Sequence, residues 1–185
     1  PCMLSNDGQT LALGSHRTTN NSLEGAVFVY EFVNGDWSQK GSTLDGSTSG
    51  NTEYFGARDT CLSGDGTVVA GYSSDAGYAK VFKYVAGSTN DWVQMGSTFT
   101  TNSMNVGGYI GVHSRLIGLS DDGTIFAVSS VSDDTTGTNN GKVEVYKFSG
   151  EAGTGSWSQV GSTIYGINNS SSESKEGSTI SLSAD

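Results

Sequence analysis

Apolar and polar residues alternate with a period of two in three segments of the chain. The segments are GAVFVYEF at 25–32, GYAKVFKY at 77–84 and GKVEVYKF at 141–148. Such an alternation places successive side chains on opposite faces of a β-strand. In the first segment Val27 and Val29 share one face, and Phe28 and Tyr30 share the other. Because both faces are apolar, we expect each of these strands to be covered on both sides.

A second phrase precedes each of these strands and consists of two apolar runs around an Asp-Gly pair. It reads LSNDGQTLALG at 4–14, LSGDGTVVAGY at 62–72 and LSDDGTIFAVS at 119–129, and its beginning returns as LSAD at 182–185. Asp-Gly between apolar runs is typical of a tight hairpin, because Gly adopts positive φ without strain. We expect these hairpins at Asp7-Gly8, Asp65-Gly66 and Asp122-Gly123.

A third phrase, W-x-Q-x-G-S-T, follows each long strand and contains all the tryptophans of the chain, Trp37, Trp92 and Trp157. We interpret it as an outer strand. The tryptophans are then packing residues at equivalent positions, because large aromatic side chains supply buried area. The Gly-Ser-Thr after each of them is expected to bend the strand.

The three phrases recur in the same order at a spacing of about 60 residues. Four antiparallel strands per repeat, with two buried faces, describe a propeller blade. The sequence therefore predicts an all-β fold with three such blades. Because propellers close with 4–8 blades, the three form part of a larger propeller. The expected blades are 1–56, 57–113 and 114–176, with 177–185 as the first strand of a further blade.

This order of phrases resembles the FG-GAP class of β-propeller repeats, which forms the head of integrin α subunits. The matching segments are YFGARDTCLSGDGTVVAGYSS, GYAKVFKYV and DWVQMGST. The Phe-Gly that gives the class its name is present as Phe55-Gly56. The resemblance implies a secreted or cell-surface protein.

Metal-binding members of that class carry several carboxylates in the hairpin, and this chain departs from their pattern. The first, third and ninth places of the pattern hold Met3, Ser5 and Leu11, then Cys61, Ser63 and Val69, then Gly118, Ser120 and Phe126. Calcium takes six to eight oxygen ligands, which one Asp or the Asp121-Asp122 pair does not supply. We therefore expect no metal and no cofactor in these hairpins.

Composition narrows the classes of function. The chain has 185 residues with 27 Gly and one Pro, and its formal net charge is −10. This charge opposes binding to nucleic acid, which depends on attraction to phosphates. No apolar run reaches the roughly 20 residues of a membrane-spanning helix.

Residues that could carry out chemistry are scattered. His16 and His113 occupy non-equivalent points of the repeat, and neither has the neighbours of a zinc site. No G-x-S-x-G motif is present. Cys2 and Cys61 lie in equivalent strands with an offset of one residue and so point to opposite faces, which argues against a mutual disulfide. The sequence therefore predicts no enzyme activity.

Three N-x-[ST] sequons lie in polar segments, at Asn20, Asn168 and Asn169. Together with the acidic composition and the resemblance, they favour an extracellular or cell-surface glycoprotein.

We expect a non-catalytic structural or adhesion module that mediates protein–protein assembly. Its partners would be the remainder of a longer chain or further copies that complete the ring, and other extracellular proteins or glycans. The alternative is a glycan-binding propeller, to which four tyrosines could contribute: Tyr72, Tyr78, Tyr109 and Tyr165. A hydrolase propeller is disfavoured because no motif places a nucleophile beside a base.

Overall fold

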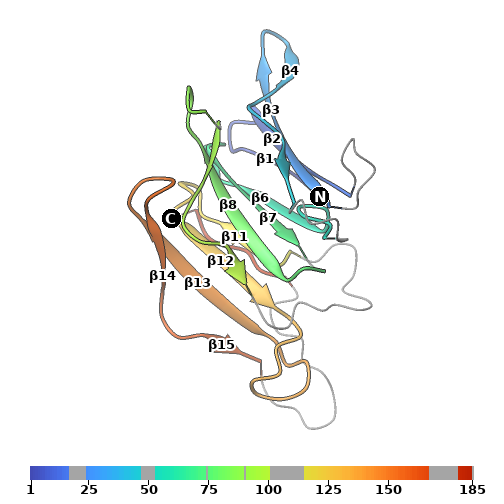
Figure 1. Ribbon diagram of the computed structural model, residues 1–185, viewed down its shortest axis with the longest axis vertical. Coiled ribbons are helices and arrows are strands. Elements are labelled where there is room, and N and C mark those ends of the chain that lie inside the picture. The colour runs from blue at the N-terminus through green and yellow to red at the C-terminus, as the bar shows by residue number, and fades with distance from the viewer. Residues whose placement is uncertain are drawn as a thin grey trace.

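The computed structural model describes residues 1–16, 24–46, 53–73, 75–89, 91–100, 115–166 and 179–184. These residues form three antiparallel sheets that lie side by side, and no helix occurs among them (Figure 1). The predicted all-β fold of antiparallel propeller blades is confirmed.

Each sheet repeats the same order of strands. The first contains β1 (Cys2–Leu4), β2 (Thr10–Ser15), β3 (Ala26–Val33), β4 (Asp36–Gln39) and β5 (Leu44–Asp45). The second contains β6 (Asp59–Leu62), β7 (Val68–Ser73), β8 (Tyr78–Tyr84), β9 (Trp92–Gln94) and β10 (Phe99–Thr100). The third contains β11 (Ile117–Leu119), β12 (Ile125–Ser130), β13 (Lys142–Ser149), β14 (Ser156–Gln159) and β15 (Ile164–Tyr165).

The outermost strand of each sheet is broken into two pieces that pair with the same long strand. In the first sheet Gln39 of β4 lies opposite Tyr30, and Leu44 of β5 lies opposite Val27. The outer strand thus advances five residues, from Gln39 to Leu44, along a stretch of β3 that is three residues long, from Tyr30 to Val27. The Gly-Ser-Thr segment makes this bend, with Gly41 at a φ of +72°.

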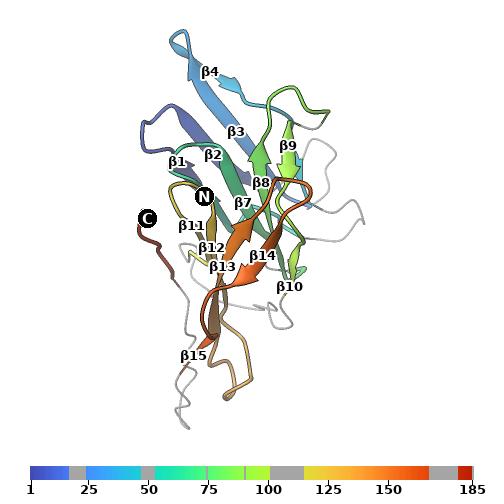
Figure 2. The same cartoon turned by 90° about the vertical axis from the view of Figure 1, so that its left-hand side faces the viewer.

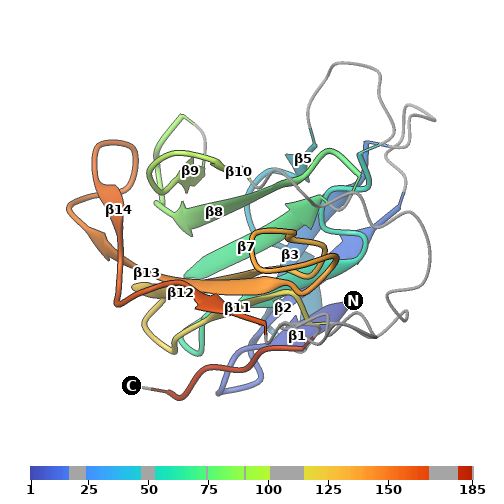
Figure 3. The same cartoon turned by 90° about the horizontal axis from the view of Figure 1, so that it is seen from below.

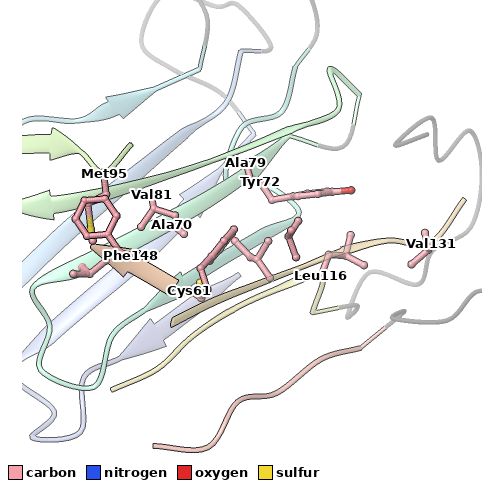
Figure 4. Close-up of a cluster of buried hydrophobic side chains, with 13 residues drawn as sticks. Cys61, Ala70, Tyr72, Ala79, Val81, Met95, Leu116, Val131 and Phe148 are labelled. Carbon is pink, nitrogen blue, oxygen red and sulfur yellow. The ribbon is translucent and has the colours of Figure 1, made fainter. Parts of the chain in front are cut away.

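The core lies between the sheets rather than within any one of them. One buried cluster joins the first sheet to the second and contains Val27, Val29 and Leu62. Another joins the second to the third, and Figure 4 shows side chains of this cluster pointing toward one another, among them Val81 and Phe148. The alternation of apolar residues therefore gives the long strand β8 of the second sheet two apolar faces. One face packs toward the first blade and the other toward the third.

The innermost strands β1, β6 and β11 lie on the opposite edge of the sheets from the tryptophan strands β4, β9 and β14 (Figure 3). Residues 179–184, the dark red segment in Figure 2, run beside β11. The N–H of Ile180 donates to the carbonyl of Arg115 at 2.9 Å, and the N–H of Asp121 donates to the carbonyl of Ala184 at 3.3 Å. The structure assigns no strand to these residues, so the extra strand predicted at 177–185 stays a prediction.

Candidate functional site

The segment 53–59, which leads into the inner strand β6, carries two buried carboxyl side chains, Glu53 and Asp59. We call it the carboxylate segment. It lies at the end of the sheets where each inner strand begins. Buried carboxylates must be satisfied by hydrogen bonds or by charge, because their desolvation is costly.

Asp59 joins the second blade to the third. Asp59 is only 4% exposed. Its Oδ2 accepts the N–H of Leu116 at 2.5 Å and the N–H of Ile117 at 2.9 Å. These donors belong to the beginning of the next inner strand, so the carboxylate holds two inner strands together.

Burial raises the pKa of Asp59 above its ordinary value. The N–H groups of Ile117 and Leu116 oppose this rise, and so does the positive charge of Arg115. The pKa of Tyr72, which lies opposite Asp59 in the register of β6 and β7, is raised by its own burial and then by the charge of Asp59. Charges of Arg58 and Asp75 also act on Tyr72. Asp59 is therefore the centre of a small electrostatic cluster.

Glu53 lies toward the first blade. Its Oε2 accepts the hydroxyl of Tyr78 at 2.7 Å, and its backbone carbonyl accepts the hydroxyl of Ser73 at 2.5 Å. The Nζ of Lys80 lies 4.9 Å from the centre of the Tyr78 ring, a cation–π distance. The two carboxylates of the segment thus belong to different blade junctions, since Glu53 bonds to Tyr78 of the cluster between the first two blades and Asp59 bonds to the third blade.

The repeat contained a signal for Asp59 that the sequence analysis missed. Counted back from the leucine that ends each inner strand, Asp59 stands where the other repeats have Pro1 and Leu116. A charged residue that replaces apolar residues at one repeat position, next to a strand buried along its length, departs from the packing pattern.

The tryptophans lie at the junctions between blades. The indole N–H of Trp92 donates to the carbonyl of Lys40 at 2.8 Å, and that of Trp157 donates to the carbonyl of Met95 at 2.6 Å. Each acceptor is the residue just before the Gly-Ser-Thr of the preceding blade. Trp37 has no preceding blade within the described residues, and its ring packs on Phe32 at 5.3 Å.

The glycine of the phrase gives the next tryptophan room. A Cβ on Gly41 would lie 2.9 Å from the Nε1 of Trp92, and one on Gly96 would lie 2.7 Å from the Cδ1 of Trp157. The glutamine braces the bend: the Nε2 of Gln39 donates to the carbonyl of Gly41 and to the hydroxyl of Thr43, both at 3.2 Å. The phrase therefore specifies a joint between blades.

The Asp-Gly pairs lie in loops of five residues between the first two strands of each sheet, with Gly8, Gly66 and Gly123 at φ of 70°, 70° and 68°. In the first loop the Ser5 hydroxyl donates to the Oδ1 of Asp7 at 2.6 Å and accepts the N–H of Thr10 at 2.9 Å. The same bonds recur in the second and third loops. The serine widens the turn beyond the tight hairpin that Asp-Gly predicts.

The remaining sequence-predicted residues do not come together. Tyr72 and Tyr78 are buried in different clusters and Tyr165 is exposed. His16 lies edge-on to Tyr54 at 5.4 Å. Tyr109, His113 and the sequon residues Asn20, Asn168 and Asn169 lie outside the described residues.

Both cysteines are free thiols, with Cys2 exposed and Cys61 buried. Burial raises the pKa of the Cys61 thiol well above its usual range. Within the described ranges no group of three or more His, Cys, Asp or Glu side chains could hold a metal ion. No helix in that same part of the chain is long and apolar enough to cross a membrane.

No protein-family profile matches the sequence, and no curated protein matches it. Solved structures do match. The periplasmic gluconolactonase of Pseudomonas aeruginosa has a TM-score of 0.53 and 19% identity over 89% of this chain and 39% of its own. A protein of Bacteroides fragilis provisionally assigned as a 6-phosphogluconolactonase has a TM-score of 0.53 and 17% identity over 89% of this chain and 38% of its own.

A protein from Lactobacillus plantarum has a TM-score of 0.54 and 15% identity, and the match covers 90% of this chain and 41% of that one. The chain thus spans about 40% of the length of the structures it matches. At these identities the likeness establishes the fold, a β-propeller shared with lactonases.

These comparisons correct the assignment to FG-GAP repeats, which was wrong. Phe55 and Gly56 have a local packing explanation: Phe55 is fully buried and stacked on Tyr78 at 5.7 Å, and Gly56 has a φ of +70° against the side chain of Val27. A Phe-Gly pair present once satisfies this junction without defining a family. The predictions of a non-catalytic adhesion module and of no enzyme activity were also wrong, because the neighbours are described as lactonases. The tyrosines of the glycan-binding alternative do not come together within the described residues.

Proposed function

We propose that the chain forms three blades of a hydrolase propeller that opens lactones. The fold that it shares with lactonases supports the proposal. Because fold alone does not specify function, the residues of the Asp59 cluster must supply the chemistry. Its buried carboxyl, held by two backbone N–H groups and acted on by the positive charge of Arg115, is the observation that carries the proposal, and burial also raises its pKa.

Water attacks a lactone carbonyl when a base removes a proton from the water and a positive charge stabilises the oxyanion. A carboxyl whose pKa is raised by burial is a stronger base than an ordinary surface carboxyl. Two backbone N–H groups fix the position of Oδ2 of Asp59. In the proposal Asp59 accepts the proton of the attacking water, and Arg115, which is exposed, faces the oxyanion. The bond between the carbonyl carbon and the ring oxygen then breaks, and Asp59 returns the proton to that oxygen.

The test is proton release from glucono-δ-lactone, followed in a pH-stat against the rate in buffer. Asp59→Asn should abolish the acceleration, and Arg115→Gln should reduce kcat while the fold persists, because the Arg115 side chain is exposed. Asp122→Asn, the same substitution in the distant turn, should leave the rate unchanged. A rate equal to that of the buffer, or full activity in Asp59→Asn, contradicts the proposal. A thermal melt of each variant separates lost chemistry from lost fold.

We also propose that the protein acts outside the cytoplasm, as one of its structural neighbours does in the periplasm. The sequons at Asn20, Asn168 and Asn169 support this location where the host glycosylates exported proteins. Glycopeptide mass spectrometry on native material would test it, and unmodified asparagine at all three positions would remove that support.

A further inference from the structure

Tyr54 of the carboxylate segment has an unusual backbone conformation. Its φ is +52°, in the left-handed region that bulky side chains rarely adopt. Among the described residues only two other non-glycine residues have positive φ, Asn34 and Asn139, and asparagine is one of the residues that tolerate this region. A tyrosine held there is strained, and such strain persists only where the surrounding structure imposes it.

Backbone contacts on both sides of Tyr54 impose its conformation. The carbonyl of Tyr54 accepts the N–H of Ala57 at 3.0 Å, and the N–H of Phe55 donates to the carbonyl of Glu24 at 2.8 Å. Gly25 allows the first blade to approach this closely, because a Cβ on Gly25 would meet the backbone of Tyr54 and Phe55. The tyrosine is therefore fixed in place before any ligand binds.

Core packing does not explain why this residue is a tyrosine. Phe55, the next residue, is fully buried between the first two blades, whereas Tyr54 is half-buried and belongs to neither buried cluster of the described residues. The ring of Tyr54 meets the exposed imidazole of His16 at 5.4 Å, with the two planes 68° apart. These two side chains, which we call the aromatic corner, lie at the end of the sheets where the inner strands begin.

The aromatic corner has the chemistry that recognises a sugar ring. The C–H groups on one face of a sugar pack well against the electron-rich face of an aromatic ring. A neutral imidazole has one nitrogen that donates and one that accepts a hydrogen bond, which suits hydroxyl groups. Strained residues are concentrated at ligand sites, where a preorganised side chain lowers the cost of binding. The strain at Tyr54 therefore favours a binding role for its ring.

The aromatic corner and Asp59 belong to different blade junctions. His16 directly follows β2 of the first blade, whereas the carboxylate of Asp59 accepts two N–H groups of the third blade. The second blade lies between them, and packed sheets are about 10 Å apart. A single sugar ring is shorter than this distance. A ring bound at the corner is therefore a second ring of a molecule whose lactone lies at Asp59.

We propose that the aromatic corner binds the second sugar ring of a glycosylated lactone while Asp59 acts on the lactone ring. This inference rests on the proposed lactone opening for the reacting end of the substrate. Contacts that are equally strong in the ground state and in the transition state lower KM and leave kcat unchanged. Tyr54 and His16 are then specificity-determining residues.

The test compares glucono-δ-lactone with cellobiono-δ-lactone, which carries a second glucose ring, in the pH-stat assay. We expect KM to be about tenfold lower for the disaccharide lactone, the effect of one well-placed aromatic contact. Tyr54→Asn should remove this preference by raising KM for cellobiono-δ-lactone, and Tyr54→Phe, which keeps the ring, should retain it. Tyr165→Asn is the matched control at an exposed tyrosine of the third blade and should also retain it.

Urea unfolding distinguishes a binding role from a structural one. Asparagine adopts positive φ with less strain than tyrosine, so Tyr54→Asn should not lower the urea midpoint. A lower midpoint combined with equal losses of activity toward both lactones would mean that the ring only stabilises the fold, and this result overturns the inference.

Binding is measured as well, so that the inference and the lactonase proposal can fail separately. In calorimetric titrations the opened product cellobionate should bind about tenfold more tightly than gluconate, and Tyr54→Asn should remove the difference. If this difference is present but neither lactone opens faster than in buffer, the aromatic corner stands and lactone opening fails. If both lactones are opened without a preference, or with one that survives Tyr54→Asn, the aromatic corner fails and lactone opening stands.

Discussion

The three tryptophans allow a matched comparison, because the same residue occupies the same repeat position under three degrees of cover. Phenylalanine keeps an aromatic ring at each position but removes the indole N–H and some volume. At Trp92 the loss leaves the carbonyl of Lys40 without its donor in a largely buried place. At Trp37 no acceptor within the described part of the chain is lost.

An unsatisfied buried polar group costs about 1–3 kcal/mol, and the cavity left by the smaller ring adds about 1 kcal/mol. We therefore expect Trp92→Phe to lower the free energy of unfolding by roughly 2–4 kcal/mol. Trp37→Phe should change it by no more than about 0.5 kcal/mol, as surface substitutions do. Trp157 is partly exposed but bonded to Met95, so its substitution should fall between the two.

The assay is equilibrium unfolding in urea, followed by circular dichroism because the substitutions alter the fluorescence. The midpoint should move while the slope stays constant, since the surface exposed on unfolding changes little. If Trp37→Phe costs as much as Trp92→Phe, the tryptophans stabilise their own blades and the joint between blades is not the reason for the repeat.

Four further outcomes follow from contacts described above. Gly96→Ala should destabilise the fold by about 2 kcal/mol or more in urea unfolding, because the new Cβ would lie 2.7 Å from the Cδ1 of Trp157. Gly35→Ala is the control and should cost less, because Gly35 also has positive φ but has open space around it in the β3–β4 turn. The pKa of Asp59 is raised on folding, so its contribution to the free energy of unfolding is fully present below its unfolded-state pKa and is lost as the pH rises through its folded-state pKa. Asp59→Asn should flatten this part of the profile of stability against pH. Asp122 has a pKa lowered chiefly by the N–H of Thr124, so its contribution is present above its unfolded pKa and lost as pH falls through its folded pKa, and Asp122→Asn should remove only that acid limb. Thermal melts with calcium and with EDTA should coincide, because the Asp7 carboxylate already accepts the Ser5 hydroxyl and the N–H of Gln9; a drop of several degrees with EDTA would contradict this.

The periodic part of the sequence predicted the periodic part of the structure. Alternation in 25–32 and its counterparts predicted strands with two covered faces, and both faces are buried against neighbouring blades wherever a neighbour exists. This works because a strand has one geometric period, which local sequence can display. Family membership was harder, since a Phe-Gly pair and an Asp-Gly turn are solutions to packing that unrelated propellers share.

Long-range contacts were the part that the sequence did not predict. Trp92 and Lys40 are far apart in the chain, and nothing local to either residue indicates that an indole will meet that carbonyl. The short strands β5, β10 and β15 also escaped, because two residues carry no detectable period. Asp59 was not predicted as a site residue for the opposite reason. It interrupts the repeat, and a search for residues that recur in every repeat does not detect a residue that occurs in one of them.

The repeated phrase therefore describes junctions more than blades. Its tryptophan acts on the preceding blade and its glycine on the following one, so a blade is stable only in the company of others, as in other repeat proteins. Within the described residues three phrases make two complete joints, between Trp92 and Lys40 and between Trp157 and Met95. A Cβ on Gly96 would meet the indole of Trp157, whereas no atom of the described residues lies within 4 Å of a Cβ built on Gly161. Gly161→Ala should therefore lower the free energy of unfolding less than Gly96→Ala does, because the two glycines have the same conformation and only Gly96 adjoins a tryptophan.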